Sequence, residues 1–336
     1  MTAWTESGAH PVGEGVYRIP LPLPQDGLRA VNVYAIADGE QVVLIDSGWA
    51  LAESTELLTR ALDGIGYGLD DIREFLVTHV HRDHYTQAVA IRRTHGTPVA
   101  LGDGEQLGLD AIREAIRTGE RPPAAHLVRA GAQDLVAQLG PPVPVTDDSG
   151  PWDLPDRWLP DGIDLPLRTR TLRVIATPGH TRGHVVFHDA AAGVLFAGDH
   201  VLPHITPSIG FEFPRAELPL RDYLESLRLV RTMPDARLLP AHGPDAASVH
   251  TRVDELLDHH EQRLTESAKA VEQGADTAYE AARVLRWTRR QRSFDDLDPF
   301  NQLLATTETM AHLDVLVLRG WLAVTVIDGV AHYRRG

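Results

Sequence analysis

The first half of the chain alternates short apolar runs with turns and amphipathic segments. Runs rich in β-branched and aromatic residues at 15–20, 31–39 and 41–48 end in Gly, Asp or Pro, and they predict successive strands of one sheet. An amphipathic helix is expected at about residues 51–62. The strand "REFLVT" follows it and leads directly into a segment rich in histidine.

A helix and a strand are expected next, at 84–95 and 97–101, and a second block of strands begins after residue 170. Its apolar runs are "LRVIATPG", "HVVFHD", "VLFAGD" and, after a helix at about 218–233, "RLLPAHG". Two blocks of strands with interspersed helices predict an α/β fold, an αββα sandwich in which two mixed β-sheets face each other and helices flank them.

The two blocks are separated by residues 104–160, which we interpret as an insertion. This segment carries two helical patterns and then a passage rich in Pro, Asp and Trp, which has too many prolines for a helix or a central strand. A segment of this length either covers a functional site or forms a surface connection, and the sequence leaves both possibilities open.

The pattern becomes mainly helical after Gly243. Helices are expected at about 246–273, 277–287 and 301–319, and a hairpin turn is expected at residues 327–329. The sequence therefore predicts two domains, a larger one at 1–243 and a small winged-helix-like α+β domain at 244–336.

Charge and composition limit the possible partners. The 336 residues include 32 Lys and Arg against 47 Asp and Glu, a formal charge of −15, and residues 244–336 have a net charge of −4. Nucleic-acid binding depends on cationic contacts to phosphate, so this balance disfavours it, and we expect the C-terminal domain to have a structural role or to form a homodimer. The five arginines at 283–292 are expected to form a solvated face.

Other features of the composition concern location and chemistry. The N-terminal residues lack a secretory signal and no apolar run is long enough to span a bilayer, so we expect a cytoplasmic protein without a membrane segment. Cysteine is absent, which excludes disulfides and thiol chemistry, so a transition metal would have to be bound by His, Asp and Glu. The 17 histidines become the candidates.

Histidines and aspartates follow several of the predicted strands. "THVHRDHYTQ" begins at residue 78, and its alternation places His79 and His81 on one side of an extended segment, ahead of Asp83 and His84 at a helix start. The other strands end at three further polar residues of the same kinds, namely His180, Asp199 and His242. Because each of these strand ends supplies a metal-ligand type, the pattern indicates a metal site.

The motifs "LIDSG", "THVHRDH", "TPGHTRGH", "AGDH" and "AHG", in this order, resemble those of the metallo-β-lactamase-fold hydrolase superfamily over residues 13–245. The ligand set is similar to that of glyoxalase II, and the C-terminal pattern is similar to that of the β-lactamase-like protein 2 group. The resemblance implies two metal ions and these ligands: His79, His81 and His180 for the first; Asp83, His84 and His242 for the second; and Asp199 as a bridge. Zinc is expected, although iron and manganese also suit these donors. Di-iron relatives carry Glu at the position of His81, which favours hydrolysis.

Further residues near these motifs are candidates for supporting roles. We expect Asp46 to accept a hydrogen bond from the ligand loop and orient it. The loop after Asp199 is expected to form the rim of the site. His200 and His204 in it have either a functional or a structural role, and Phe211 and Phe213 either wall an apolar acyl pocket or anchor the loop. His184 and His188 are expected to be packed or hydrogen-bonded. The remaining histidines are expected on surfaces or caps: His10, His95, His126, His250, His259, His260, His312 and His332.

A dinuclear site of this kind predicts a metal-dependent hydrolase. Two ions can share a hydroxide, which attacks an electrophilic centre, while Asp199 bridges the ions and Asp83 steers the proton. The expected substrate is a small molecule with an ester-like acyl bond, a thioester or a lactone. Two alternatives are a phosphodiesterase or endoribonuclease acting on single-stranded nucleic acid, and a non-catalytic winged-helix binding protein.

Overall fold

The computed structural model describes residues 4–24, 27–119, 123–138 and 152–336. Its first sheet has seven strands in the order β1 to β7. Strands β1 to β4 are antiparallel neighbours, whereas β4 to β7 run parallel. The bounds are β1 His10–Gly13, β2 Val16–Pro22, β3 Ala30–Asp38, β4 Gln41–Ile45, β5 Ile72–Val77, β6 Val99–Gly102 and β7 Arg157–Leu159.

The second sheet has five strands in the order β12-β11-β10-β9-β8. Strands β11 and β12 are parallel and the other neighbours are antiparallel, so both sheets are mixed, as predicted. Its strands are β8 Asp164–Pro166, β9 Thr171–Ala176, β10 Val185–Asp189, β11 Val194–Gly198 and β12 Arg237–Pro240.

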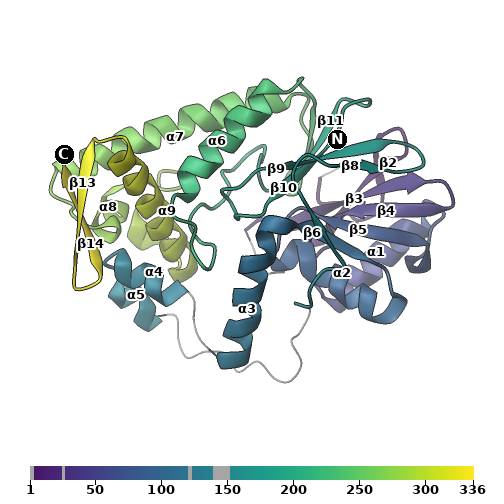
Figure 1. The fold of residues 1–336 in the computed structure, drawn as a ribbon, viewed down its shortest axis with the longest axis horizontal. Helices are drawn as coiled ribbons and strands as arrows, with labels where there is room; N and C mark the ends of the chain where they lie inside the picture. The colour runs from purple at the N-terminus through teal and green to yellow at the C-terminus, as the bar shows by residue number, and fades with distance from the viewer. Residues whose placement is uncertain (1–3, 25–26, 120–122, 139–151) are drawn as a thin grey trace.

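Three apolar layers hold the sandwich together. One lies between the sheets, where Tyr34 and Leu76 on the first sheet meet residues such as Phe187 on the second. Another packs the outer face of the first sheet under α1 (Ala52–Asp63) and α2 (Arg82–His95). The third packs the second sheet under α6 (Pro219–Thr232) and α7 (Val249–Glu272), which confirms the αββα arrangement (Figure 1).

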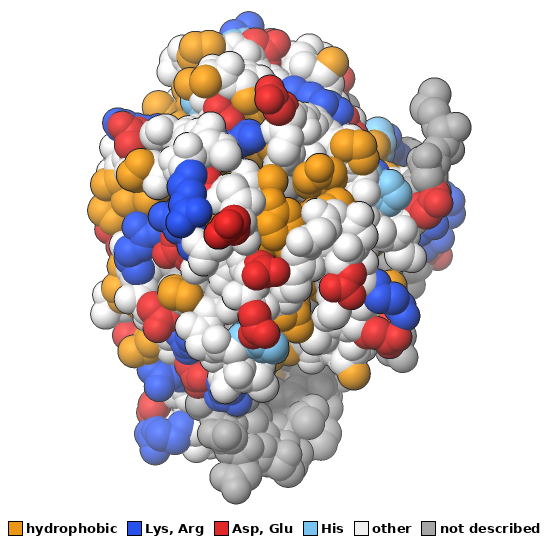
Figure 2. All heavy atoms as spheres, turned by 90° about the vertical axis from the view of Figure 1, so that its right-hand side faces the viewer, with side chains coloured by type: hydrophobic (Ala, Val, Ile, Leu, Met, Phe, Trp, Pro, Cys, Tyr) orange, Lys and Arg blue, Asp and Glu red, His pale blue; other side chains and the backbone are white. Residues whose placement is uncertain are grey.

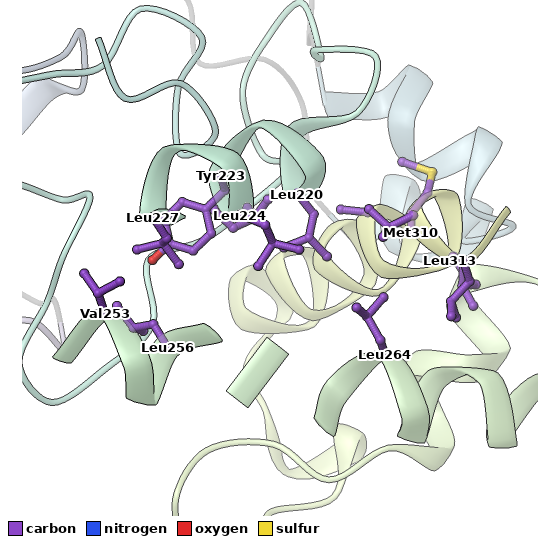
Figure 3. Close-up of a cluster of buried hydrophobic side chains, with 14 of the residues drawn as sticks. Leu220, Tyr223, Leu224, Leu227, Val253, Leu256, Leu264, Met310 and Leu313 are labelled. Carbon is purple, nitrogen blue, oxygen red and sulfur yellow. The ribbon is translucent and has the colours of Figure 1, made fainter. Parts of the chain in front are cut away.

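The C-terminal region consists of helices and a small sheet. After α7 come α8 (Ala278–Val284), α9 (Pro299–Leu318) and the antiparallel pair β13 (Leu322–Ile327) and β14 (Val330–Arg335). Figure 3 shows Leu220 and Tyr223 of α6 meeting Leu264 of α7 and Met310 of α9 in one buried cluster. The same cluster includes Leu195 of the second sheet, so one core is continuous from the sandwich into the C-terminal region.

The insertion contains three helices in the part that the structure describes. These are α3 (Gln106–Thr118), α4 (Pro123–Arg129) and α5 (Gln133–Gln138), and residues 139–151 of the insertion lie outside the described residues. Leu127 and Leu135 pack with Trp287, Phe294 and other residues of the C-terminal region in a separate apolar cluster. The insertion therefore contacts the C-terminal region, next to which α4 and α5 are seen in Figure 1.

Several described elements were not predicted from the sequence, among them β7 and α4. The passage rich in proline contains β7, which pairs with β6 at the edge of the sheet, a position where missing N–H donors do little harm. The short helix α4 begins at Pro123, in a run that the periodicity did not mark as helical.

The surface carries charges of both signs. On the face turned to the viewer in Figure 2, acidic and basic side chains are interspersed with apolar ones. Among the described helices, none combines the length and the apolar character that crossing a bilayer requires.

Candidate metal centre

The loops that follow four strands bring all seven expected ligands together. His79 lies two residues beyond β5, and His81 is the N-cap residue of α2, which carries the next candidates in its first turn. His180 lies between β9 and β10, Asp199 directly follows β11, and His242 follows β12. Loops from both sheets therefore contribute to one site.

The seven residues form two groups, within each of which one donor atom per residue lies within 4.8 Å of the others. In the first group, Nε2 of His79 and Nε2 of His180 each lie 3.0 Å from Nδ1 of His81. Asp199 belongs to this group through Oδ2, which is 3.4 Å from His180 Nε2. Three imidazole nitrogens and a carboxylate oxygen thus converge on one point.

The second group consists of Asp83, His84 and His242. Oδ2 of Asp83 lies 3.6 Å from His84 Nε2 and 3.5 Å from His242 Nε2. The other oxygen of Asp199, Oδ1, lies 3.3 Å from His242 Nε2 and 3.7 Å from His84 Nε2. Asp199 therefore presents one carboxylate oxygen to each group.

The hydrogen bonds of the outer ring nitrogens fix which nitrogen faces inward. Nδ1–H of His180 donates to the carbonyl of Ser208, and Nδ1–H of His242 donates to the carbonyl of Ala30, each at 2.8 Å. A carbonyl can only accept, so both Nε2 atoms carry lone pairs toward the site. Nδ1 of His84 lies 2.9 Å from Oδ2 of Asp46, which likewise directs its Nε2 inward.

Asp46 joins two of the ligand-bearing segments. Its Oδ1 accepts hydrogen bonds from the N–H of Thr78 at 2.8 Å and from the Thr78 hydroxyl at 3.0 Å, while its Oδ2 faces His84. Because the Thr78 hydroxyl donates to Asp46, its oxygen accepts from Nδ1–H of His79 at 3.0 Å. One buried carboxylate thereby orients a histidine of each group.

The donor set fits divalent metal ions. His84 Nε2, His242 Nε2 and Asp199 Oδ1 are buried and have no hydrogen-bond partner among the described residues. Buried polar atoms are normally paired, so three unpaired atoms of these kinds that face one another indicate a place for positive charge between them. Imidazole and carboxylate donors are the usual ligands of zinc and also suit iron and manganese.

Burial and neighbouring charges set the ionisation of these groups. Burial lowers the pKa of His81 to about 3 and that of His180 to about 4, which leaves both rings neutral. Burial would also lower the pKa of His84, but the carboxylates of Asp46, Asp83 and Asp199 outweigh it and raise that pKa to about 10. Burial would raise the pKa of Asp83, yet the neighbouring histidines, led by His84, hold it below its usual value.

One residue that the sequence did not mark as functional joins two of the segments that carry the candidate ligands. Glu105, fully buried, accepts hydrogen bonds from the N–H of Val80 at 3.4 Å and from the hydroxyl of Thr181. These neighbours lie beside the ligands His79 and His180, respectively. Burial raises the pKa of Glu105 to about 8. The motif "GDGE" gave no signal for this role, because it depends on a contact with a distant segment.

His184 supports Asp199 directly. Its Nε2 accepts the backbone N–H of Asp199 at 3.1 Å, and its Nδ1 lies 2.9 Å from the Thr177 hydroxyl oxygen. The ring also stacks on His79, with 5.0 Å between the ring centroids. His184 is hydrogen-bonded and not part of either donor group, whereas His188 lies in β10 and is largely buried.

The structure places the four expected rim residues differently from one another. His200 is fully buried with its ring 5.3 Å from that of Tyr223 on α6, which favours the structural one of its two expected roles over a place at the rim. His204 is exposed. Phe211 contacts Phe300 of α9, with 5.6 Å between ring centroids, and Phe213 contacts His126 of α4, with 5.9 Å between them. These contacts anchor the loop to the C-terminal region and to the insertion.

Two of the remaining histidines are also not where they were expected. His260 of α7 and His312 of α9 are buried, and their rings stack at 28° with 5.3 Å between the centroids. They were expected on a surface because the sequence did not show that α7 and α9 pack against each other.

The fold and the two donor groups define a metal-dependent hydrolase of the αββα class. The family model of the metallo-beta-lactamase superfamily matches residues 26–242, and the chain belongs to this superfamily of hydrolases. The resemblance inferred from the motifs is thereby confirmed.

Individual relatives extend the comparison. A beta-lactamase-like protein 2 homologue of Caenorhabditis elegans is 25% identical over 246 residues, which cover 73% of this chain and 67% of that protein. An atrochrysone carboxyl ACP thioesterase of Aspergillus fumigatus is 24% identical over 249 residues, and this chain spans only 46% of its length.

A solved structure, the metallo-beta-lactamase family protein TTHA1429 of Thermus thermophilus, superposes with a TM-score of 0.76 at 27% identity. The match covers 96% of this chain and 99% of that one, so the similarity includes the C-terminal region. A beta-lactamase domain protein of Burkholderia ambifaria gives a TM-score of 0.75 at 27% identity and covers 98% of this chain and 95% of that one.

Proposed function

We propose that this protein is a hydrolase with two divalent metal ions, zinc in the first instance, that cleaves a thioester or lactone bond of a small molecule. The observation that carries the proposal is the orientation of Asp199, whose two carboxylate oxygens face two separate groups of donors. A carboxylate in this position suits a bridge between two cations, and a single cation would leave the second group of buried lone pairs unpaired.

The proposed ligands of the two ions correspond to the two donor groups. His79, His81 and His180 would hold one ion, and Asp83, His84 and His242 the other, with Asp199 between them. Divalent ions in such a site supply Lewis acidity, which lowers the pKa of water and polarises a carbonyl group.

The chain supplies the proton transfer. Asp83 is ionised, because the neighbouring histidines hold its pKa low, and its side chain is 16% exposed at the edge of the site. We assign to its carboxylate the proton of the attacking water, which it then passes to the leaving group. A Ser or Cys nucleophile is not required.

Three considerations favour an acyl substrate. The chain has a formal charge of −15, which opposes the approach of a nucleic acid. Imidazole at position 81 completes a donor set that is suited to hydrolysis. Finally, one relative is named a thioesterase, although this chain spans less than half of it.

The C-terminal region suits a winged-helix-like architecture in its order of three helices and one hairpin. Its arginines at 283, 286, 289, 290 and 292 are exposed, and only Arg283 lies on a helix, so they do not form one helical face. We retain cleavage of single-stranded nucleic acid as the alternative, because these exposed arginines lie close together along the chain.

Metal analysis tests the dinuclear site. Purified protein reloaded with zinc should contain about two ions per chain. The isosteric variant Asp199→Asn should lose acyl hydrolysis and bind less zinc, because an amide cannot bridge two cations. The matched control Asp328→Asn, in the hairpin turn, should behave as the wild type. Wild-type protein that binds no metal would exclude the site.

A substrate panel tests the reaction. Acyl-CoA thioesters and lactones should be hydrolysed by the zinc form and not by Asp199→Asn. RNA cleavage that is sensitive to salt, without acyl hydrolysis, would establish the alternative activity instead. Full metal loading with neither activity would support a binding protein.

A further inference from the structure

Strand β3 carries one polar residue where its neighbours are apolar. Asn32 is fully buried, and Val31 and Val33 on either side of it belong to the core under the first sheet. An amide buried among apolar side chains is costly unless its polar atoms are paired, so its contacts should reveal why it is there.

The Asn32 amide binds the segment that carries His242. Its Nδ2 donates to the carbonyl of Pro240 at 2.9 Å and to the carbonyl of Gly243 at 2.8 Å. Its backbone N–H donates to the carbonyl of Ala241 at 2.7 Å. The three residues around His242 on this short segment are therefore all hydrogen-bonded to Asn32, which lies 208 positions before Pro240.

His242 itself is held by the same strand, since its Nδ1–H donates to the carbonyl of Ala30. Directly after it, Gly243 has a φ of 96°, so the chain leaves the site through a conformation that favours glycine. The side-chain amide of Asn32 joins the two ends of this turn, because it binds the carbonyls of both Pro240 and Gly243.

On the basis of the function proposed above, we propose that Asn32 is a positioning residue that holds His242 in place for the second metal ion. The position requires two N–H donors on a single atom, because two carbonyl oxygens must be bound at once. An aspartate of the same shape would place an acceptor oxygen against both carbonyls. An apolar residue would leave the Gly243 carbonyl without this donor.

The cost of the residue argues against a role in packing alone. Oδ1 of Asn32 is buried and has no hydrogen-bond partner among the described residues. A buried unpaired acceptor lowers the stability of the folded state, so this side chain is not the best choice for stability. What the side chain contributes is the pair of hydrogen bonds that it donates to the segment around His242.

The test compares zinc affinities in Asn32→Leu and Asn32→Ala with those of the wild type and of the ligand variant His242→Ala. Competition with a zinc chelator gives both dissociation constants, and calorimetry gives the unfolding temperature of the metal-free chains. We expect one constant to weaken by about 10- to 100-fold in both Asn32 variants and the other to stay unchanged. The constant affected should be the one that His242→Ala affects. The retained ion also shows that the variants fold.

The matched control is Tyr34→Phe. The Tyr34 hydroxyl donates to the same Pro240 carbonyl at 2.7 Å, but its loss leaves the Asn32 contacts in place, so both constants should match those of the wild type. Unchanged constants in the Asn32 variants, with a lower unfolding temperature alone, would overturn the inference, and so would equal weakening of both. Wild-type protein that binds a single ion would instead contradict the proposed function and this inference together.

Discussion

Asp46 combines a special backbone conformation with hydrogen bonds to three groups. Its φ is 60°, in the left-handed region, where Asn and Asp are tolerated better than other residues with a side chain. The turn after β4 thereby places its carboxylate between Thr78 and His84, on the outer side of the metal centre. The residue links the first sheet to both donor groups.

The variant Asp46→Asn should separate this role from folding. Asn accepts the same backbone conformation and can still accept from Thr78, but its N–H groups face Nδ1–H of His84. We expect zinc affinity to fall by about 10- to 100-fold because His84 is no longer oriented. Chelator competition measures the affinity, and an unfolding temperature close to that of the wild type should accompany the loss. Unchanged affinity would show that His84 needs no partner.

The convergence of the seven candidate ligands could be predicted from the sequence because each lies within a few residues of a strand end, in a motif of the superfamily. The partners of those ligands could not. Asn32 sits in an ordinary apolar strand and Glu105 in a short turn, and each acquires its role from a segment that is distant along the chain. Sequence periodicity reports which face of an element is buried, but it does not report which loop lies opposite.

Among the elements, two loops cross with almost no space between their backbones. A Cβ at Gly183 would lie 2.0 Å from the backbone nitrogen of Glu105, and a Cβ at Gly102 would lie 2.2 Å from the carbonyl oxygen of Gly183. The loop after β6 is pressed in this way against the loop that carries His180. Glycine at these positions is a requirement of the crossing.

Gly183→Ala should therefore destabilise the protein by about 1–3 kcal/mol or more, because the two nearest atoms belong to the backbone and cannot move aside. Urea unfolding measures the change. Gly13→Ala is the control, since its Cβ would make only an ordinary contact of 3.8 Å with Val16 and its stability should stay close to that of the wild type. Equal stability of the two variants would mean that the crossing can open.

Helices α7 and α9 meet through two buried histidines. Nδ1 of His260 lies 3.1 Å from Nε2 of His312, whose Nδ1–H donates to the carbonyl of Glu308. Burial lowers the pKa of His312 to about 3 and that of His260 well below its usual 6.5. Both rings are therefore neutral in the folded protein at pH 7.

These two histidines should make the folded state sensitive to acid. The unfolded chain binds protons at both rings below a pH of about 6.5 and the folded chain does not. The free energy of unfolding therefore decreases as the pH is lowered, by up to about 1.4 kcal/mol per pH unit for each ring. Urea unfolding between pH about 7.5 and about 5.5 should show a smaller slope for the double variant His260→Leu, His312→Leu than for the wild type. The exposed His204→Leu should keep the slope of the wild type. An unaltered slope in the double variant would show that the pair is protonated when folded.

At the scale of the whole molecule, the continuous core bears on the domain boundary that the sequence predicts at residue 243. Leu220, Tyr223 and Leu227 of α6 lie in one cluster with Val253 of α7 (Figure 3). The same cluster includes Leu195 of the sandwich. The insertion adds a second connection, through Leu127 and its neighbours on the C-terminal helices. Residues on both sides of position 243 thus share their burial.

We therefore expect the full chain to unfold in a single transition and a chain truncated after Gly243 to be unstable. Each large side chain on α6 that loses its cover forfeits about 1.5–3 kcal/mol, and several such losses approach the whole stability of a typical domain. Calorimetry of the full chain and dye binding to the truncated one measure the two effects. A soluble truncated chain with a sharp transition and full zinc binding would show that residues 1–243 fold independently, and that the shared core joins two domains which do not depend on each other.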